Sequence, residues 1–300
     1  MAIESAVPFS ATVDVAEPVT TTVAEPPNRG LAKKILWYAL LTFIALVIFF
    51  PIYISVVNSL LKPDQIARRP PSFFPSHPQW SSYSKAWSQG HLGKFLLNSA
   101  IVTGIIVAFE VGLSIVAAYA FAFLEFPFKR TLFTVFLATL MIPFEVTIAT
   151  NLDTIVKLNA YNTYVGLAMP FLATGFGAFL LRQAFLQLPK DLKDAAALDG
   201  YGHLRFLTRV VIPLARPGIA ALTVFAFLSA WNQYLWPLLV TKDQRLRTVQ
   251  IGLGFLRAQQ IDQVNVTFAG TVIAVIPLFL LLVVFQKQLV RGLTAGAVKG

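Results

Sequence analysis

Long apolar runs separated by polar connections dominate this 300-residue chain. About 20 consecutive apolar residues suffice for a helix to cross the hydrocarbon core of a bilayer, and runs of roughly that length recur along the sequence. The pattern therefore predicts an all-α, polytopic membrane protein with about six transmembrane helices. The expected spans are Ile35–Leu61, Phe95–Phe123, Thr131–Ile148, Tyr164–Leu181, Gly218–Leu239 and Thr267–Phe285.

The composition agrees with lipid as the solvent and excludes several kinds of site. Hydrophobic residues make up 56% of the chain and charged residues only 13%, whereas soluble domains carry about 25% charged residues. The chain has no cysteine, and its three histidines are far apart in sequence. We therefore expect neither a disulfide framework nor a metal site in this chain.

The net charge of +10 raises the question of nucleic-acid binding. The basic residues do not form a patch interleaved with aromatic residues, as a nucleic-acid surface requires; they occur in short groups between the apolar runs. We therefore expect no nucleic-acid partner, and we interpret the basic groups as topology signals in contact with membrane lipid. With the two termini inside, the inner connections and ends carry 14 Lys and Arg and the outer loops 10. This bias predicts that both termini are cytoplasmic.

The N-terminal segment 1–30 differs from the rest of the chain. Residues 1–28 contain no Lys or Arg and are rich in Ser, Thr, Ala and Pro, so they cannot bury enough apolar surface to offset the entropy of ordering. We predict a disordered cytoplasmic tail over 1–30, followed by one transmembrane domain over 31–300.

The most informative connection is the charged loop 182–216. It contains an expected short helix, Asp191–Leu198, with acidic residues in its first turn, where they favour the helix dipole. Gly200 follows, as expected for a left-handed residue that terminates a helix. A second expected helix runs from Gly202 to Val211 and is ended by Pro213 and Pro217. The alternative is an amphipathic linker that lies on the lipid surface.

The spacing inside this loop is specific. Asp194-Ala195-Ala196 is followed by three residues, then Gly200, nine residues and Val210-Val211-Ile212-Pro213. This arrangement resembles the EAA loop of binding-protein-dependent ABC importer permeases, with Asp for Glu and with Val210 and Ile212 for Ile and Leu. The resemblance implies a coupling loop over 190–213 that docks on an ATPase subunit through Asp194, Ala195, Ala196, Gly200 and Pro213.

Other segments narrow the resemblance. Ala230-Trp231-Asn232 and the C-terminal stretch 290–300 are similar to the carbohydrate-uptake branch of this family. Leu140–Val146 and Trp231–Leu239 are most similar to its permeases for glycerol-3-phosphate and glycerophosphodiesters. The alternative solute within the family is a di- or oligosaccharide.

The resemblance also implies partners in the inner membrane of a prokaryote. They are a second homologous permease, a dimer of ATP-binding cassette ATPases, and an extracytoplasmic solute-binding protein that meets the loops 62–94 and 240–266. The chain has no GxxxxGK[ST] stretch, so we expect no enzymatic activity and no cofactor in it; ATP and Mg would be bound by the ATPase subunits.

Polar residues inside the spans are candidates for a solute pathway, because they are costly in lipid and usually face a cavity or a partner. The pathway prediction comprises Glu145, Trp231, Asn232, Gln233 and Tyr234. Glu110 is a further intramembrane acid, and Trp236 is expected to be an anchor at the membrane boundary. The alternative for the polar groups is hydrogen bonding between helices.

Two other function classes are compatible with a multispan chain. A membrane-embedded enzyme should show clustered His, Asp, Glu or Cys residues, and the sequence shows none. A self-contained secondary transporter often shows inverted repeats and charge relays; the buried glutamates are its main support, and the loop motif argues against it.

Overall fold

The computed structural model describes residues 29–259 and 262–297, and the chain divides at Pro51 into two compact units. The expected tail 1–30 lies outside the described residues, except that α1 already begins at Arg29. The described residues form helices and loops, without a strand, so the all-α prediction is confirmed. The helices are α1 (Arg29–Leu60), α2 (Pro63–Ile66), α3 (Ser81–Ser88), α4 (Leu92–Phe123), α5 (Lys129–Ala138), η1 (Thr139–Met141), α6 (Phe144–Lys157), α7 (Tyr164–Ala168), η2 (Met169–Phe171), α8 (Gly175–Leu186), α9 (Asp191–Leu198), α10 (His203–Phe206), η3 (Leu207–Val211), α11 (Ile212–Leu214), α12 (Arg216–Trp231), α13 (Leu235–Val240), α14 (Val249–Gln259) and α15 (Val264–Ala297).

Three of the helices are long and apolar enough to cross a membrane unaided. They cover Lys33–Leu60, Leu92–Phe123 and Val264–Gln288, which correspond to the first, second and sixth expected spans. The described chain reaches six spans only if three sharply bent pairs of helices each count as one. The described chain therefore agrees with about six spans, and the third, fourth and fifth expected spans each contain a break.

The third span is interrupted at Pro143. Lys129–Met141 and Phe144–Lys157 meet at an angle of 97°, and Ile142 between them has an extended backbone. Proline disfavours the helical conformation of the preceding residue, which explains why the helix ends there. Pro143 then lies at the N-cap of α6, where a missing N–H costs nothing.

The fourth and fifth spans are interrupted as well. The pair Tyr164–Phe171 and Gly175–Leu186 bends by 49°, and the hydroxyl of Thr174 caps the second helix by accepting the N–H of Gly177 at 3.1 Å. The expected fifth span stops at Trp231, and α13 begins only at Leu235. Pro237 lies in the first turn of α13, a position that suits a residue without an N–H.

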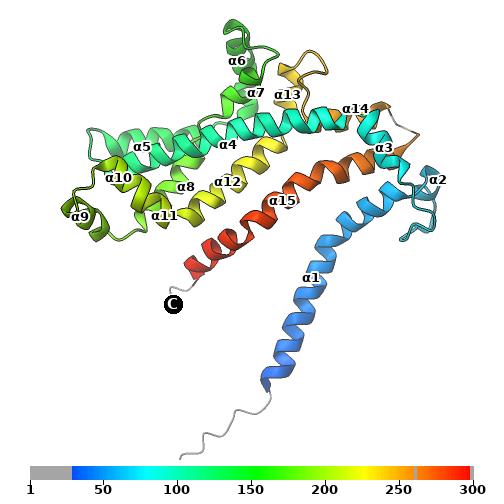
Figure 1. Ribbon diagram of the computed structural model, residues 1–300, viewed down its shortest axis with the longest axis horizontal. Helices are drawn as coiled ribbons and strands as arrows, with labels where there is room; N and C mark the ends of the chain where they lie inside the picture. Colours follow the sequence, from blue (N-terminus) through cyan, green and yellow to red (C-terminus); the bar gives the residue numbers. More distant parts are fainter. Residues whose placement is uncertain (1–28, 260–261, 298–300) are drawn as a thin grey trace, which may run out of the picture. The chain divides into compact units, whose positions relative to one another are not determined.

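Within the unit Ile52–Gly300, α4 is the central element. It packs against α8, α12, α14 and α3, while α12 packs against α15; α4, α12 and α15 run side by side (Figure 1). The approach of α8 to α4 is close, because a Cβ at Gly177 would overlap the hydroxyl of Ser114. Both ends of α4 are buried in apolar clusters, one with α3, α14 and α15, the other with α8, α9 and α10.

Candidate functional site: the coupling loop and the polar pocket of the bundle

The first expected helix of the loop 182–216 is present with the predicted limits, α9 at Asp191–Leu198. Its end is a Schellman motif: the N–H of Tyr201 donates to the carbonyl of Ala196 at 2.8 Å, and the N–H of Gly200 donates to that of Ala197 at 3.0 Å. Gly200 has φ +74°, in the left-handed region where a side chain is strained. The predicted role of Gly200 as the terminating residue is confirmed.

The loop is firmly attached to the membrane helices. Ala196 is buried in an apolar cluster with Tyr119 of α4, Phe185 of α8 and Phe206 of α10. The ammonium of Lys193 donates to the carbonyl of Phe123 at 3.0 Å. The Tyr119 hydroxyl and the His203 Nδ1 share a hydrogen bond of 3.0 Å. A force on α9 is therefore passed directly to the ends of α4 and α8.

The opposite side of the loop is open. Asp194 and Ala195 are exposed, and the Asp194 carboxylate has no ion pair or hydrogen bond with another described residue. Leu198 is 90% exposed and Leu204 is 75% exposed. Exposed leucines on α9 and α10, together with an exposed carboxylate on α9, suit a protein partner. Our sequence analysis did not single out Leu198; its position at the C-terminal end of α9 was the available signal.

The second half of the loop departs from the expected single helix. Residues His203–Phe206 are α-helical, Leu207–Val211 form a π-helical turn, and Ile212–Leu214 return to α-helix. Pro213 does not end the helix as expected; it directly follows the π-helical turn, and the helix continues to Leu214. The chain turns at Ala215 instead, and α12 follows at 79°.

Adjacent alanines provide a test of this arrangement. Ala196→Glu would bury an unpaired carboxylate and should lower the free energy of unfolding by about 2–4 kcal/mol. Ala195→Glu places the same side chain on the exposed side and should change it by less than about 0.5 kcal/mol. Thermal unfolding of the detergent-solubilised chain measures both; equal melting temperatures for the two variants would contradict the packing of α9.

The residues predicted for a solute pathway lie at the break between α12 and α13. Trp231 is 2% exposed, stacks on Phe227 and donates its indole N–H to the carbonyl of Ala274 at 3.2 Å. It packs within the bundle, in contrast to the expected solute contact. Asn232 and Tyr234 are exposed. The buried Oε1 of Gln233 has no hydrogen-bond donor among the described residues.

Glu145 follows the break at Pro143 and lies in the first turn of α6. Its side chain is exposed. The neighbouring Phe144 meets Trp236 at a ring-centroid distance of 5.7 Å, so the starts of α6 and α13 are adjacent. Trp236 itself is 2% exposed and donates to the carbonyl of Gly166 at 3.2 Å; the expectation of a boundary anchor is wrong.

The structure contains a polar pocket that the sequence analysis did not predict. Its volume is about 110 Å³, and Glu110, Thr174, Ser229 and Gln233 contribute its polar groups. The Thr174 hydroxyl donates to Glu110 Oε1 at 2.7 Å, and Glu110 is only 6% exposed. The remaining lining is apolar: Ile106, Phe171, Phe176, Phe225, Ala226 and Ala230.

This pocket is rich in hydrogen-bond acceptors. The Glu110 carboxylate and the unpaired Gln233 carbonyl oxygen need donors, and no Lys or Arg is among the described residues that line the pocket. Phe225 at its edge is 49% exposed, so the pocket lies beside a face of α12 that the chain leaves open. Hydroxyl groups of a ligand would supply the missing donors. The described residues contain no group of His, Asp and Glu placed to hold a metal ion.

Comparison with known proteins identifies the family. Residues 110–295 match the model of the binding-protein-dependent transport system inner membrane component. The chain belongs to this family. It is an ABC importer permease, an inner-membrane protein that crosses the bilayer several times. The matched region includes the coupling loop and every residue of the pocket lining except Ile106.

Curated relatives cover almost the whole permease. The sn-glycerol-3-phosphate transport system permease protein UgpE of Yersinia pestis bv. Antiqua is 34% identical over 274 residues, which are 89% of this chain and 97% of the relative. The protein of the same name from Agrobacterium fabrum is 34% identical over 279 residues, with the same coverage. The one from Brucella abortus is 36% identical over 257 residues, 83% of this chain and 91% of the relative.

The fold of the permease is found in a solved structure. A chain of a bacterial ABC transporter that imports the acidic polysaccharide alginate aligns with a TM-score of 0.73 at 21% identity, covering 87% of this permease and 98% of that chain. A chain of the alginate transporter in complex with an alginate pentasaccharide-bound periplasmic protein aligns with a TM-score of 0.60. The overall fold is therefore that of a known ABC transporter chain.

Far from the coupling loop, a polar clasp joins two connections of the permease. Asn162 donates from its Nδ2 to Asp243 Oδ2 at 3.3 Å, and its Oδ1 accepts the N–H of Lys242 at 3.0 Å. The backbone N–H of Arg245 donates to Asp243 Oδ1 at 2.8 Å. This backbone hydrogen bond, followed by those from Asn162 and the Arg245 side chain, holds the pKa of the Asp243 carboxyl below its usual value.

Folding lowers the pKa of Asp243, so the ionised carboxylate stabilises the clasp. This stabilisation is fully present at pH values above the ordinary Asp pKa of about 3.9. It is lost as the pH falls through the lower pKa of the folded state. Asp243→Asn should therefore raise the rate of hydrogen exchange at the Lys242 and Arg245 amides near neutral pH. In this variant, acidification should no longer cause the loss of protection that protonation of Asp243 causes in the wild type. Asp153→Asn, which breaks an exposed ion pair with Lys157, is the matched control. Unchanged exchange in Asp243→Asn would contradict the clasp.

Proposed function

We propose that this permease forms half of the translocation pathway for glycerol-3-phosphate or a related glycerophosphodiester. The observation that carries the proposal is the 34% identity to glycerol-3-phosphate permeases over 89% of this chain and 97% of the relative. Because the alignment covers most of this chain, it includes the coupling loop and the pocket.

The polar pocket suits the glycerol end of such a solute. Glu110 Oε2 and Gln233 Oε1 can accept hydrogen bonds from two hydroxyl groups, and the phenyl rings of Phe171 and Phe225 line the wall. A volume of about 110 Å³ is small, so it fits a three-carbon polyol better than a disaccharide. The phosphate would be repelled by Glu110 and must be bound outside this pocket, on the open side of α12 or by the second permease.

The proposed assembly follows from the two exposed surfaces. A dimer of ATP-binding cassette subunits, which supplies ATP and Mg, would receive α9 through Asp194, Ala195 and Leu198, with both termini of the permease on the cytoplasmic side. A second homologous permease would cover the open face of α12. A solute-binding protein would meet the loops 62–94 and 240–266, and the periplasmic protein in the complex of the alginate transporter supports this partner.

The mechanism couples movement of α9 to the pocket. Closure of the ATPases on bound ATP would displace α9, and the buried cluster around Ala196 would pass the displacement to α8. Thr174, at the N-cap of α8, would then move relative to Glu110. The solute would be bound in the outward-facing state and released when the ATPases reopen.

Uptake into proteoliposomes tests the proposal. The chain would be co-expressed with its native neighbours, purified as a complex and supplied with binding protein, ATP and radiolabelled solute. We expect ATP-dependent uptake of glycerol-3-phosphate or glycerophosphocholine and co-purification of a second permease and an ATPase. Uptake of oligosaccharide alone would reassign the solute within the family; uptake without ATP or an ATPase would overturn the proposal.

A further inference from the structure

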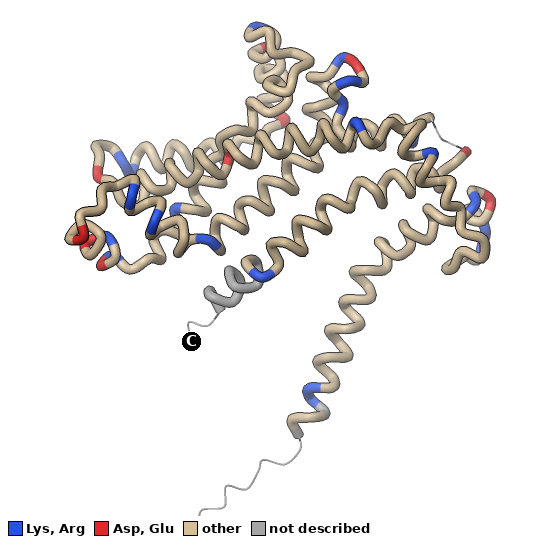
Figure 2. Tube along the Cα trace, viewed as in Figure 1, with Lys and Arg blue, Asp and Glu red and all other residues tan. Residues whose placement is uncertain are grey.

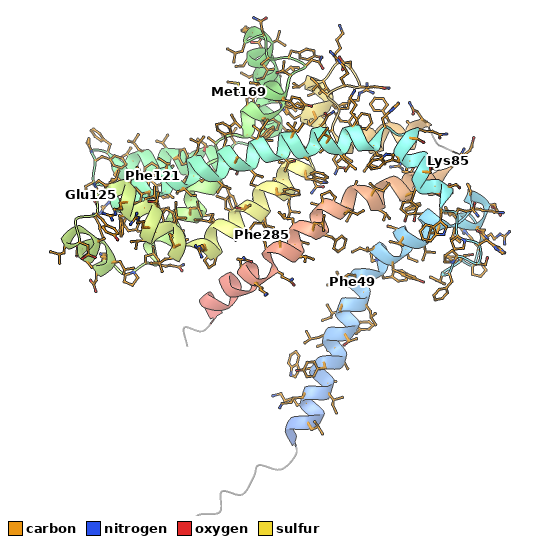
Figure 3. The ribbon with its side chains drawn as sticks, in the orientation of Figure 1. Phe49, Lys85, Phe121, Glu125, Met169 and Phe285 are labelled. Atoms are coloured by element: carbon orange, nitrogen blue, oxygen red, sulfur yellow. The ribbon has the colours of Figure 1, made fainter. Side chains whose placement is uncertain are left out.

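A second cavity lies at the end of the bundle that carries the coupling loop. Its volume is about 470 Å³, and it is bounded by the C-terminal turn of α4, the loop to α5, the first turns of α5, and Arg182 of α8. Phe121 and Glu125 mark it at the α5 and α9 end of the molecule (Figure 3). Several Lys and Arg residues lie along the chain at this end (Figure 2). The proposed solute pathway makes no use of this cavity.

Arg182 is held with its charge toward the cavity. Its Nε donates to the carbonyl of Phe121 at 3.2 Å, and its guanidinium carbon lies 4.2 Å from the centroid of the Phe133 ring. These two interactions use one of the five N–H groups of the guanidinium. The other four are not hydrogen-bonded to described residues, and a fixed fork of this kind binds phosphate oxygens at low entropic cost.

Two further cations complete the lining. Lys129 donates to the carbonyl of Leu124 at 2.6 Å and to Glu125 at 3.2 Å, so its ammonium is fixed at the rim. Arg130 is exposed, and its guanidinium has no ion pair with a described residue. Glu125 is the one carboxylate among the described lining residues, and its side chain is 89% exposed. Cations therefore outnumber anions by three to one in the cavity.

The cavity lies where two spans leave the bilayer. α4 ends at Phe123 and α5 begins at Lys129. On the face of α5 opposite to the cavity, Phe128, Leu132 and Val135 are all at least half exposed, as expected for a helix side that faces lipid. A basic pocket between transmembrane helices at the membrane boundary is a recurrent site for phosphorylated headgroups.

We propose that this cavity, lined by Arg182, Arg130 and Lys129, binds a phosphate mono- or diester, and that its occupant is the headgroup of an anionic phospholipid. The Arg182 fork would bind two phosphate oxygens, while Arg130 and Lys129 would neutralise the remaining charge. The occupant would bridge α4, α5 and α8, and α4 and α8 also hold the coupling loop. The inference is independent of the identity of the transported solute.

Native mass spectrometry of the complete transporter tests the site. The complex would be taken from vesicles containing equal amounts of phosphatidylglycerol and phosphatidylcholine. We expect phosphatidylglycerol to be retained preferentially, with about tenfold lower retention in Arg130→Gln/Arg182→Gln. Arg216→Gln, which removes an exposed charge outside the cavity, is the matched control and should bind like the wild type.

Two single variants separate binding from folding. Arg130→Gln removes a side chain without a described ion pair and should lower retention a few-fold without affecting the packing. Glu125→Gln removes the opposing carboxylate and should raise retention a few-fold, an increase that misfolding cannot produce. Wild-type retention in both variants would overturn the site.

Competition identifies the source of the phosphate. If the acyl chains contribute to the affinity for the lipid, millimolar inorganic phosphate or glycerol-3-phosphate should not displace phosphatidylglycerol. If a soluble phosphate ester binds, with the same dependence on Arg130 and Glu125, and the lipid does not, the phosphate site stands and its occupant is soluble. If neither the lipid nor the soluble phosphate shows that dependence, the cavity binds no phosphate and the proposal fails.

Discussion

Gly200→Pro is expected to reduce solute uptake to background while the permease still inserts into the membrane. Gly200 has φ +74° and donates its N–H to Ala197, whereas proline requires φ near −65° and has no N–H. Loss of both features costs roughly 3 kcal/mol, or more than about a hundredfold in the population of the correctly formed loop. The complex should lose its ATPase subunit on purification but retain the second permease.

Gly202→Ala is the matched control for this variant. Gly202 is two residues away, has φ −76°, and a Cβ there would meet no atom within 4 Å. Uptake and ATPase retention should be close to wild type. Asp194→Arg, which reverses an exposed charge without disturbing the fold, should also abolish uptake. Normal uptake by Gly200→Pro and Asp194→Arg would refute the assignment of α9 as the coupling element.

Thr174→Val is expected to weaken solute uptake by about 10- to 100-fold in apparent affinity. The substitution keeps the shape of the side chain but removes the hydroxyl that donates to Glu110 and caps α8. Leaving a buried hydrogen-bonding group unsatisfied costs about 1–3 kcal/mol, and the loss frees Glu110 to move out of the pocket. Glu110→Leu, which removes the acceptor itself, should be more severe.

Thr103→Val provides the comparison. Thr103 is 1% exposed on the same helix as Glu110, but it does not line the pocket, and its hydroxyl has no described hydrogen-bond partner. The substitution should leave uptake unchanged. Concentration-dependent uptake by the intact complex, with the bound ATPase quantified in parallel, gives the readout. Equal effects of Thr174→Val and Thr103→Val would show that the pocket is only structural.

The first half of the coupling loop, α9 and Gly200, could be predicted residue by residue, because its signals are local. Acidic residues in a first turn and a glycine after the last helical residue act within one turn of the chain, and the structure places α9 and Gly200 at those positions. Pro143 and Pro237 were equally local signals for the broken third and fifth spans. Hydropathy averages over such breaks, so it predicts the apolar run and conceals the bend.

The polar pocket could not be predicted, because it depends on packing between distant segments. Glu110 and Thr174 are separated by 64 residues and Gln233 by a further 59, and only the contacts of α4 with α8 and α12 bring them together. Trp231 and Trp236 were misjudged for the same reason. Each is buried with its indole N–H bonded to a carbonyl of another segment, a partner that no local pattern specifies.

The geometry of α8 allows a small tilt at one end of this helix to displace its other end. It has 12 residues and is therefore about 18 Å long, with its C-terminal end fixed to the coupling loop through Phe185 and its N-terminal end at Thr174. A tilt of about 5° at one end moves the other by about 1.6 Å, which is enough to break the 2.7 Å hydrogen bond to Glu110. In the proposed mechanism, that single bond should therefore report, from within the membrane, whether the ATPase partners are open or closed.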